Sequence, residues 1–264
     1  MFAGSFYPAE PAPLAAMVRE CLRGDAGREP EQAAAIIVPH AGYIYSGRVA
    51  GAVYGAVALS SALIVLCPNH TGEGSPLAVI DRGVWRTPLG DAVVNEPLAR
   101  RVLETCCGVE VDHRAHRREH SLEVQLPFLQ TTLKEFSFVP ICVGTARLET
   151  LTRLGDDLAQ VLRAGPERVS LVITSDMSHY IPADKARVKD MIAVERVEAV
   201  DPEGLHRVVE SNDISMCGYA PAVAGLTAAR ANGARTGRLL AYANSGDVTG
   251  DNERVVGYAG LVIS

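Results

Sequence analysis

The stretch AAAIIVPHAGYIYSG, residues 33–47, ends a short β-branched run on a histidine and a glycine-rich turn. The run Ala-Ile-Ile-Val is typical of a strand that is buried on both faces, as in parallel sheets covered by helices. The same order returns in SALIVLCPNHTGEG (61–74), where a second apolar run ends in Pro-Asn-His. A third run, SLVITSDMSHY (170–180), ends on Asp176 and His179. Three strand-like runs therefore deliver histidines at their carboxyl ends.

Short apolar runs alternate with longer helical stretches along the whole chain. Strands are expected over residues 34–38, 63–67, 77–81, 136–142, 169–174, 238–243 and 255–263. Helices are expected over residues 13–22, 47–59, 97–106, 121–133, 148–162, 183–199, 203–210 and 221–232. The alternation indicates one α/β domain over residues 1–264, with a mostly parallel sheet flanked by helices and an antiparallel hairpin from the last two strands. Gly51 and Gly55 are expected to let their helix approach the sheet closely.

The carboxyl ends of parallel strands are where open α/β sheets bind ligands. His40 and His70 each follow a strand-like run and a proline, and Asp176 and His179 follow the third run. The prolines are expected to end strand pairing, because proline has no N–H to donate. The sequence therefore predicts that these four side chains gather at one edge of the sheet.

Bulk composition excludes several classes of protein. The net charge of -6, without any Lys/Arg cluster, argues against a nucleic-acid-binding surface. No apolar run approaches the ~20 residues that span a bilayer, and the start MFAGSFYPAEPAP lacks the pattern of a secretory signal. The six cysteines form no CxxC pair, and Cys67 and Cys142 lie in strand-like runs as buried thiols. We expect a cytoplasmic protein without membrane or nucleic-acid partners.

His40 and His70 are candidate metal ligands, because neutral imidazoles on rigid strand ends suit a metal ion. A single histidine would more often be a packed core residue, but two in the same setting reverse those odds. A tight site needs a third ligand, and the sequence offers four candidates: Asp176, His179, His120 and Cys217.

Cys217 lies in DISMCGYAPAVAGL, just before a predicted helix. The positive end of a helix dipole lowers the pKa of a thiol, so Cys217 is a candidate thiolate ligand or nucleophile. The alternative is a small buried cysteine. His120 lies at a predicted helix start in REHSLEVQLPFL, either facing a substrate or serving as part of a polar cap. His113 and His116 fall in a charged run that predicts a solvated surface, and His206 is read as an ordinary helix residue.

Tyr43 and Tyr45 follow the first histidine and either line a pocket or pack in the core. The chain contains no GxGxxG, Walker A or GxSxG match, which removes motif support for nucleotide binding and for a hydrolase elbow.

The motifs GSFYP, VPHAGYIYSG, CPNHTG, TPLGD, EHSLEVQLPF, SDMSHY and MCGYAP together resemble the Memo family, named for a mediator of cell motility. Its bacterial and archaeal members are labelled AmmeMemoRadiSam system protein B. The resemblance runs from about Gly4 to the C-terminus. It implies the fold of class III, LigB-like extradiol dioxygenases.

The resemblance also assigns roles to residues of this chain. It implies that His40, His70 and Cys217 form a metal-binding triad. Asp176 and His179 would flank the same pocket, and His120 would stand near it. In the dioxygenases the third ligand is a carboxylate, whereas Cys217 holds the matching place here.

Two classes of function follow from these residues. The first is an iron(II)-dependent dioxygenase-like enzyme acting on a catechol-like small molecule, with His179 as general acid/base and Asp176 orienting it. Tyr43 or Tyr45 would donate a hydrogen bond to bound oxygen. The second is a non-catalytic protein that binds copper or iron, or a phosphotyrosine-containing peptide. Metal-assisted hydrolysis with zinc is a weaker alternative, and the family label indicates a functional link to a radical-SAM protein.

Overall fold

Four adjacent parallel strands form the centre of the sheet in the computed structural model, which describes residues 2–23 and 29–264. β1 (Ala35–Val38) pairs with β8 (Val169–Thr174), β8 pairs with β2 (Ala62–Pro68), and β2 pairs with β7 (Ser137–Val143). Every residue of β1 and β2 is buried, as the continuous apolar runs predict. The three strands that end on candidate site residues therefore lie side by side, with β8 between β1 and β2.

The remaining strands extend this sheet on both sides. The order through the described residues is β10-β11-β1-β8-β2-β7-β3-β6. β10 (Gly237–Asn244) and β11 (Val255–Ile263) form the predicted antiparallel hairpin, and β11 also pairs antiparallel with β1. The other strands are β3 (Leu77–Val79), β4 (Val84–Thr87), β5 (Gly90–Val94), β6 (Glu110–Val111) and β9 (His179–Ile181). β4, β5, β6 and β9 were not predicted, because they are short and lack a continuous apolar run.

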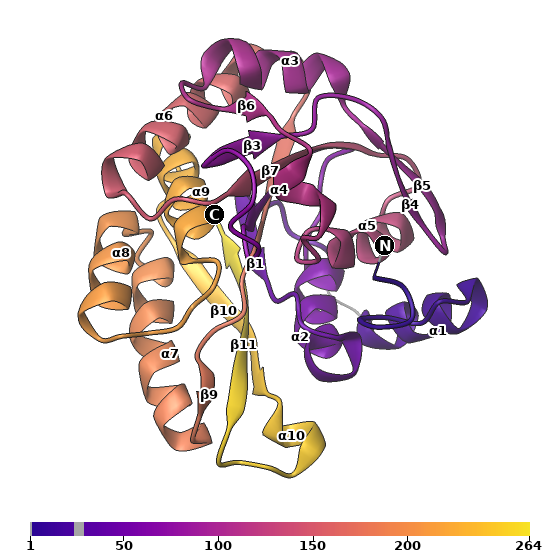
Figure 1. Ribbon diagram of the computed structural model, residues 1–264, viewed down its shortest axis with the longest axis vertical. Coiled ribbons are helices and arrows are strands. Elements are labelled where there is room, and N and C mark those ends of the chain that lie inside the picture. Colours follow the sequence, from indigo (N-terminus) through magenta and orange to yellow (C-terminus); the bar gives the residue numbers. More distant parts are fainter. Residues whose placement is uncertain (1, 24–28) are drawn as a thin grey trace.

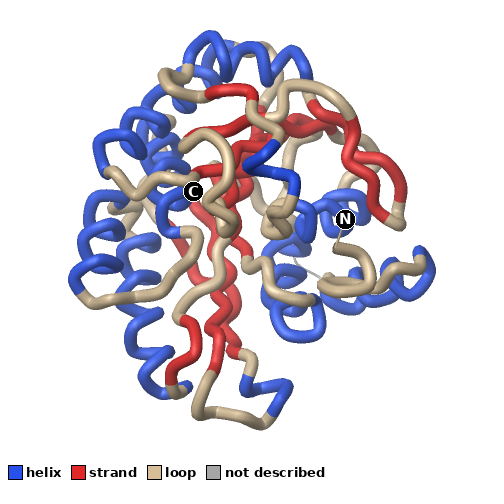
Figure 2. The backbone as a smooth tube through the Cα atoms, in the orientation of Figure 1, coloured by secondary structure: helices blue, strands red, loops and turns tan. Residues whose placement is uncertain are grey.

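Helices cover both faces of the sheet, as Figures 1 and 2 show. One layer contains α3 (Glu96–Thr105), α6 (Leu148–Ala164), α7 (Ala183–Glu198), α8 (Pro202–Ser211) and α9 (Tyr219–Ala231). The other contains α1 (Pro11–Cys21), α2 (Tyr43–Ala56) and α5 (Leu126–Thr132). Two short helices, α4 (Arg114–Arg117) and α10 (Gly246–Thr249), lie in connections. The predicted mostly parallel α/β sheet flanked by helices is confirmed.

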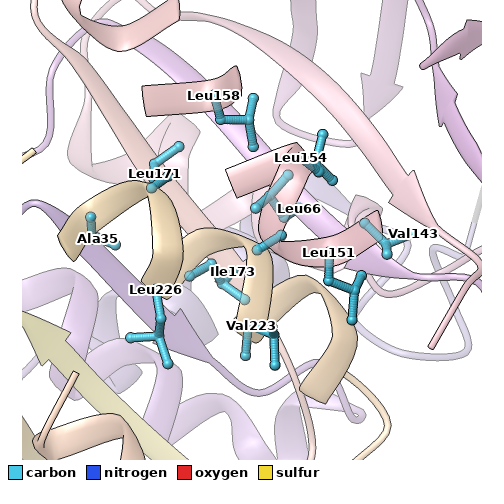
Figure 3. Packing of buried hydrophobic residues seen from close by; sticks show 14 of the residues in the cluster. Ala35, Leu66, Val143, Leu151, Leu154, Leu158, Leu171, Ile173, Val223 and Leu226 are labelled. Carbon is cyan, nitrogen blue, oxygen red and sulfur yellow. The ribbon is translucent and has the colours of Figure 1, made fainter. Parts of the chain in front are cut away.

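Each layer has its own hydrophobic core against the sheet. In the first, Leu151 and Leu154 of α6 pack with Val223 of α9 and with Leu66 and Ile173 of the sheet (Figure 3). Burying a leucine side chain contributes about 1.5–3 kcal/mol relative to leaving it exposed. This packing fixes the strands whose ends carry the site.

The glycines of α2 allow close approach of a different element from the one predicted. A Cβ added to Gly51 would lie 2.2 Å from the backbone oxygen of Cys21, and one added to Gly55 would lie 3.0 Å from that of Leu22. These glycines therefore admit the end of α1, whereas the prediction placed the sheet there. No helix in the described ranges is long and apolar enough to cross a membrane.

Candidate metal centre

Three histidines meet beyond the carboxyl ends of β1 and β2. His40 follows β1, His70 follows β2, and His120 lies between α4 and the 3-10 turn η1 (Glu123–Gln125). One nitrogen from each ring lies within 4.8 Å of the others. The ring centroids are 5.2 Å apart for His40 and His70, 4.9 Å for His70 and His120, and 5.5 Å for His40 and His120. This is the one such group that the described residues form, and it can hold a metal ion.

Glu119 fixes the orientation of His70. Its Oε1 lies 2.8 Å from Nδ1 of His70, and its Oε2 accepts the backbone N–H of the same residue at 2.7 Å. Ser121 donates to Oε1 through both its backbone N–H and its hydroxyl, at 3.0 and 2.6 Å. A carboxylate that holds Nδ1–H leaves Nε2 as the ligand atom. The prediction missed Glu119, although it directly precedes His120 in the motif REHS.

Glu119 and His70 stabilise each other's charged forms. Burial opposes ionisation of Glu119, but the hydrogen bond and charge of His70 and the bonds from Ser121 outweigh it and lower the pKa of the carboxyl to about 2. Burial likewise opposes protonation of His70, yet Glu119 outweighs it and raises the pKa of that imidazole. Glu119 is therefore a buried anion beside the metal-binding group.

His40 is held by its own oxygen partners. Its Nδ1 is hydrogen-bonded to the hydroxyl of Thr174, the last residue of β8, and its backbone N–H donates to Oδ1 of Asp176 at 2.8 Å. The ring is buried. Burial, followed by the charges of His70 and His120, lowers the pKa of His40 well below its ordinary value. The neutral imidazole that results is the form that binds metals.

Cys217 lies beside His40, with Sγ 3.1 Å from Nε2. It stands outside the group of three mutually close histidines. The expected lowering of its thiol pKa is wrong for the metal-free chain: burial, together with the charge of Asp176, raises it. The helix dipole does not prevail because α9 begins two residues later, at Tyr219, and the sulfur is partly withdrawn from water.

Asp176 and His179 flank the group on the β8 side. Asp176 is buried, and burial raises the pKa of its carboxyl to about 6 against the opposing effect of the N–H groups of His40 and Ala41. His179 is half-buried, with Nδ1 2.8 Å from the backbone oxygen of Ser215. Both groups therefore lie beside the three histidines, and the raised pKa lets Asp176 exchange a proton in the range near pH 6.

The N-terminal segment lines the site beside His120. The ring of Phe6 stacks on His120 at 4.3 Å between centroids, and Phe2 meets it edge-on at 5.8 Å. Burial, with a smaller effect of the charge of His70, lowers the pKa of His120 to about 4. His120 thus presents a neutral ring to the group, whereas the sequence placed it at the start of a helix.

Of the two alternatives for Tyr43, a pocket or the core, the structure has the core, and it corrects the expectation for His116. Tyr43 is buried, donates its hydroxyl proton to the backbone oxygen of Val124 and packs on Phe128, so it belongs to the core; Tyr45 is half-buried in the first turn of α2. His116 is also buried, with Nε2 3.1 Å from the oxygen of Ala78, although its charged neighbours predicted a solvated surface. A turn of α4 directs it inward.

Comparisons with known proteins agree with the sequence motifs. The Memo family, described as Memo-like protein, matches residues 1–262. A MEMO1 family protein of Aquifex aeolicus is 41% identical, with 98% of this chain and 96% of that protein covered. One from Methanopyrus kandleri is 40% identical, again with 98% and 96% covered.

A solved structure shares the fold at low sequence identity. The crystal structure of an uncharacterized protein from Escherichia coli K12 matches with a TM-score of 0.59 at 14% identity, covering 86% of this chain and 98% of that one. This likeness concerns the fold alone. The family match over nearly the full length and the relatives near 40% identity are decisive: the chain belongs to the Memo family.

Proposed function

We propose that this protein binds iron(II) at the centre formed by His40, His70 and His120, with Cys217 as a further donor beside His40. The observation that carries the proposal is the convergence of three imidazole nitrogens within 4.8 Å. The Nδ1 atoms of His40 and His70 are both engaged by oxygen partners, so their Nε2 atoms are left as ligands.

The donor set fits such an ion. Imidazole suits iron, copper and zinc, and a nearby thiol can supply the anionic donor that neutral rings lack. The chemistry that iron(II) supplies in such a donor set is reaction with dioxygen at open coordination positions. The LigB-like fold of the family supports a dioxygenase-like centre for a catechol-like or related small molecule.

His179 and Asp176 would handle protons for this reaction. Because Nδ1 of His179 faces a carbonyl oxygen, it carries the hydrogen, and Nε2 is left to accept a proton from a phenolic hydroxyl. Asp176 accepts a hydrogen bond from the backbone N–H of His40. This bond connects the two proton-transferring residues to the chain that carries a proposed metal ligand. Phe2 and Phe6 would exclude water from the His120 side.

The test is binding of 4-nitrocatechol to the iron(II)-loaded protein without oxygen, followed by its visible spectrum. We expect the spectrum of a doubly deprotonated, bound catecholate in the wild type and weaker binding in His179→Ala. Oxygen uptake with a panel of catechols follows. If neither spectral change nor oxygen uptake occurs in fully loaded protein, the dioxygenase proposal is wrong.

Copper binding is the second candidate, favoured by the 3.1 Å contact between Cys217 Sγ and His40 Nε2. A soft thiolate selects copper(I) over iron(II). On this alternative, Cys217→Ser would reduce copper(I) affinity far more than iron(II) affinity, measured by chelator competition. Equal losses for both metals would count against it.

A further inference from the structure

Asp190 of α7 is a buried acid outside the metal centre. Its side chain is fully buried. Oδ1 accepts the backbone N–H of Ser178 at 2.9 Å, and Oδ2 accepts the hydroxyl of Tyr242 at 2.8 Å. Both partners are neutral, and withdrawing a carboxyl group from water without a cationic partner is unfavourable. A role beyond stability is therefore the better explanation for an acid at this position.

The segment that Asp190 holds is the one that carries Asp176 and His179. Figure 1 shows β9, which begins at His179, between α7 and β11. The N–H of Met177 donates to the oxygen of Gly257 at 2.8 Å, and the N–H of Gly257 donates to the oxygen of Ser178 at 2.9 Å. The segment is thus tied to β11 on one side and to α7, through Asp190, on the other.

There is no free space at this junction. A Cβ added to Gly257 would lie 2.1 Å from Oδ2 of Asp190 and 3.2 Å from Cβ of Met177. The helix, the strand and the loop therefore meet in close contact at the Asp190 carboxylate.

The residue after His179 shows that the backbone here is under constraint. Tyr180 has φ +58°, in the left-handed region that a side chain with Cβ disfavours. Such a conformation costs about 1–3 kcal/mol and persists only where surrounding contacts enforce it. The bond from Ser178 to Asp190 lies two residues before Tyr180, and His179 and Ile181 on either side of it pair with β11.

Contacts between this segment and Ser215 determine which nitrogen of His179 carries the hydrogen. The backbone N–H of His179 donates to Oγ of Ser215 at 2.8 Å, and Nδ1 lies 2.8 Å from the oxygen of Ser215. A carbonyl oxygen only accepts, so Nδ1 is protonated and Nε2 is left as the base. Both contacts require the chain to leave Ser178 in one direction.

We propose that Asp190 is a positioning residue, which fixes Ser178 and thereby holds His179 as the Nδ1–H tautomer with Nε2 available to a substrate. The use of that Nε2 in catalysis rests on the proposed function; the tautomer itself does not. Asp190 contributes through its acceptor oxygen toward Ser178, and the Tyr242 bond only orients the carboxylate.

The test reads the His179 tautomer by ¹⁵N NMR in histidine-labelled, metal-free protein at pH 8, with His179→Gln assigning the signal. We expect the Nδ1–H form in the wild type, in Asp190→Asn, which retains an acceptor for Ser178, and in Tyr242→Phe. Asp190→Ala removes the acceptor, and we expect a mixture of both tautomers. If Asp190→Ala does not fold, Asp190→Ser replaces it, since its hydroxyl is too short to reach Ser178.

A stability control separates positioning from general loosening. Asp112 is another buried acid, which accepts the N–H of Ser75 at 3.0 Å far along the chain from His179. Asp112→Ala should lower the thermal midpoint while leaving the His179 tautomer unchanged. The proposal is overturned if folded Asp190→Ala keeps a pure Nδ1–H form, or if Asp112→Ala alters the tautomer equally. Failure of the wild type to bind metal would refute the proposed function and leave this result standing.

Discussion

Glu119 is hydrogen-bonded to His70 at two points, with Oε1 2.8 Å from the ring Nδ1 and Oε2 2.7 Å from the backbone nitrogen. The carboxylate therefore fixes both the direction of the chain after β2 and the tautomer of the ring. Because Glu119 is itself buried and bonded by Ser121, this orientation exists before any metal arrives.

Glu119→Gln tests this preorganisation. The amide has one accepting oxygen and one donating nitrogen, so it cannot accept from both N–H groups of His70. Its nitrogen would face one of these donors without forming a hydrogen bond. We expect metal affinity to fall by about 10–100-fold, measured by competition with a chromophoric chelator. Glu104→Gln, on an exposed face of α3, is the matched control and should bind like the wild type. Unchanged affinity in Glu119→Gln would show that His70 needs no carboxylate.

The raised pKa of Cys217 predicts a slow thiol in the metal-free protein. Only the thiolate is nucleophilic, and burial disfavours it. With iodoacetamide at pH 8, we expect exposed Cys107 to react first and Cys217 to react more than about tenfold slower. Peptide mass spectrometry over time gives both rates. Labelling of Cys217 at the rate of Cys107 would indicate an activated thiolate.

His116 predicts a loss of stability in mild acid. Burial lowers its pKa in the folded state to about 4, against 6.5 in the unfolded chain. Its contribution is therefore complete above pH 6.5 and declines as the pH falls toward 4, because the unfolded chain then binds the proton more readily. Between pH 7.5 and pH 5 this linkage amounts to about 2 kcal/mol in the free energy of unfolding.

Urea unfolding of wild type and His116→Gln at the two pH values measures that difference. The glutamine amide places an N–H near the position of Nε2, so it retains a donor for the oxygen of Ala78 but does not titrate. We expect the variant to lose about 2 kcal/mol less than the wild type on acidification. Identical pH dependence would mean that His116 is protonated without cost.

In Gly51→Ala, a gain in helix propensity is opposed by a steric clash with the end of α1. Alanine in place of glycine favours a helix interior by about 1 kcal/mol, but its Cβ would lie 2.2 Å from the backbone oxygen of Cys21. Overpacking of this kind costs about 1–3 kcal/mol, so we expect a net loss of thermal stability. Gly55→Ala, with 3.0 Å to the nearest atom, should be close to neutral. A stabilised Gly51→Ala would show that α1 moves away freely.

The central sheet was predictable because its strands are continuous apolar runs, and β8 and β11 have the predicted bounds. The helix expected over 121–133 instead begins as η1 and continues as α5. Pro127 at the start of α5 accounts for the break, since its ring blocks the preceding turn. β4 and β5 escaped prediction because their residues are partly exposed and pair with each other.

The site was predictable where residues follow strands and hidden where loops bring them in. His40, His70 and Asp176 follow adjacent parallel strands, so topology alone brings them together. Glu119 and His120 arrive from a loop about fifty residues later in the chain than His70, and no local pattern reveals that contact. The inward turn of His116 and the partial burial of Cys217 likewise depend on tertiary packing.

The most direct test of the metal centre is the metal content of protein purified without oxygen and loaded with iron(II). The variants are His40→Ala, His70→Ala, His120→Ala and Cys217→Ser, with exposed His113→Ala as the control. We expect about one iron per chain in the wild type and the control, none in His40→Ala or His70→Ala, and weakened retention in His120→Ala and Cys217→Ser. Full iron content in His40→Ala or His70→Ala, or no metal in the wild type, would contradict the account.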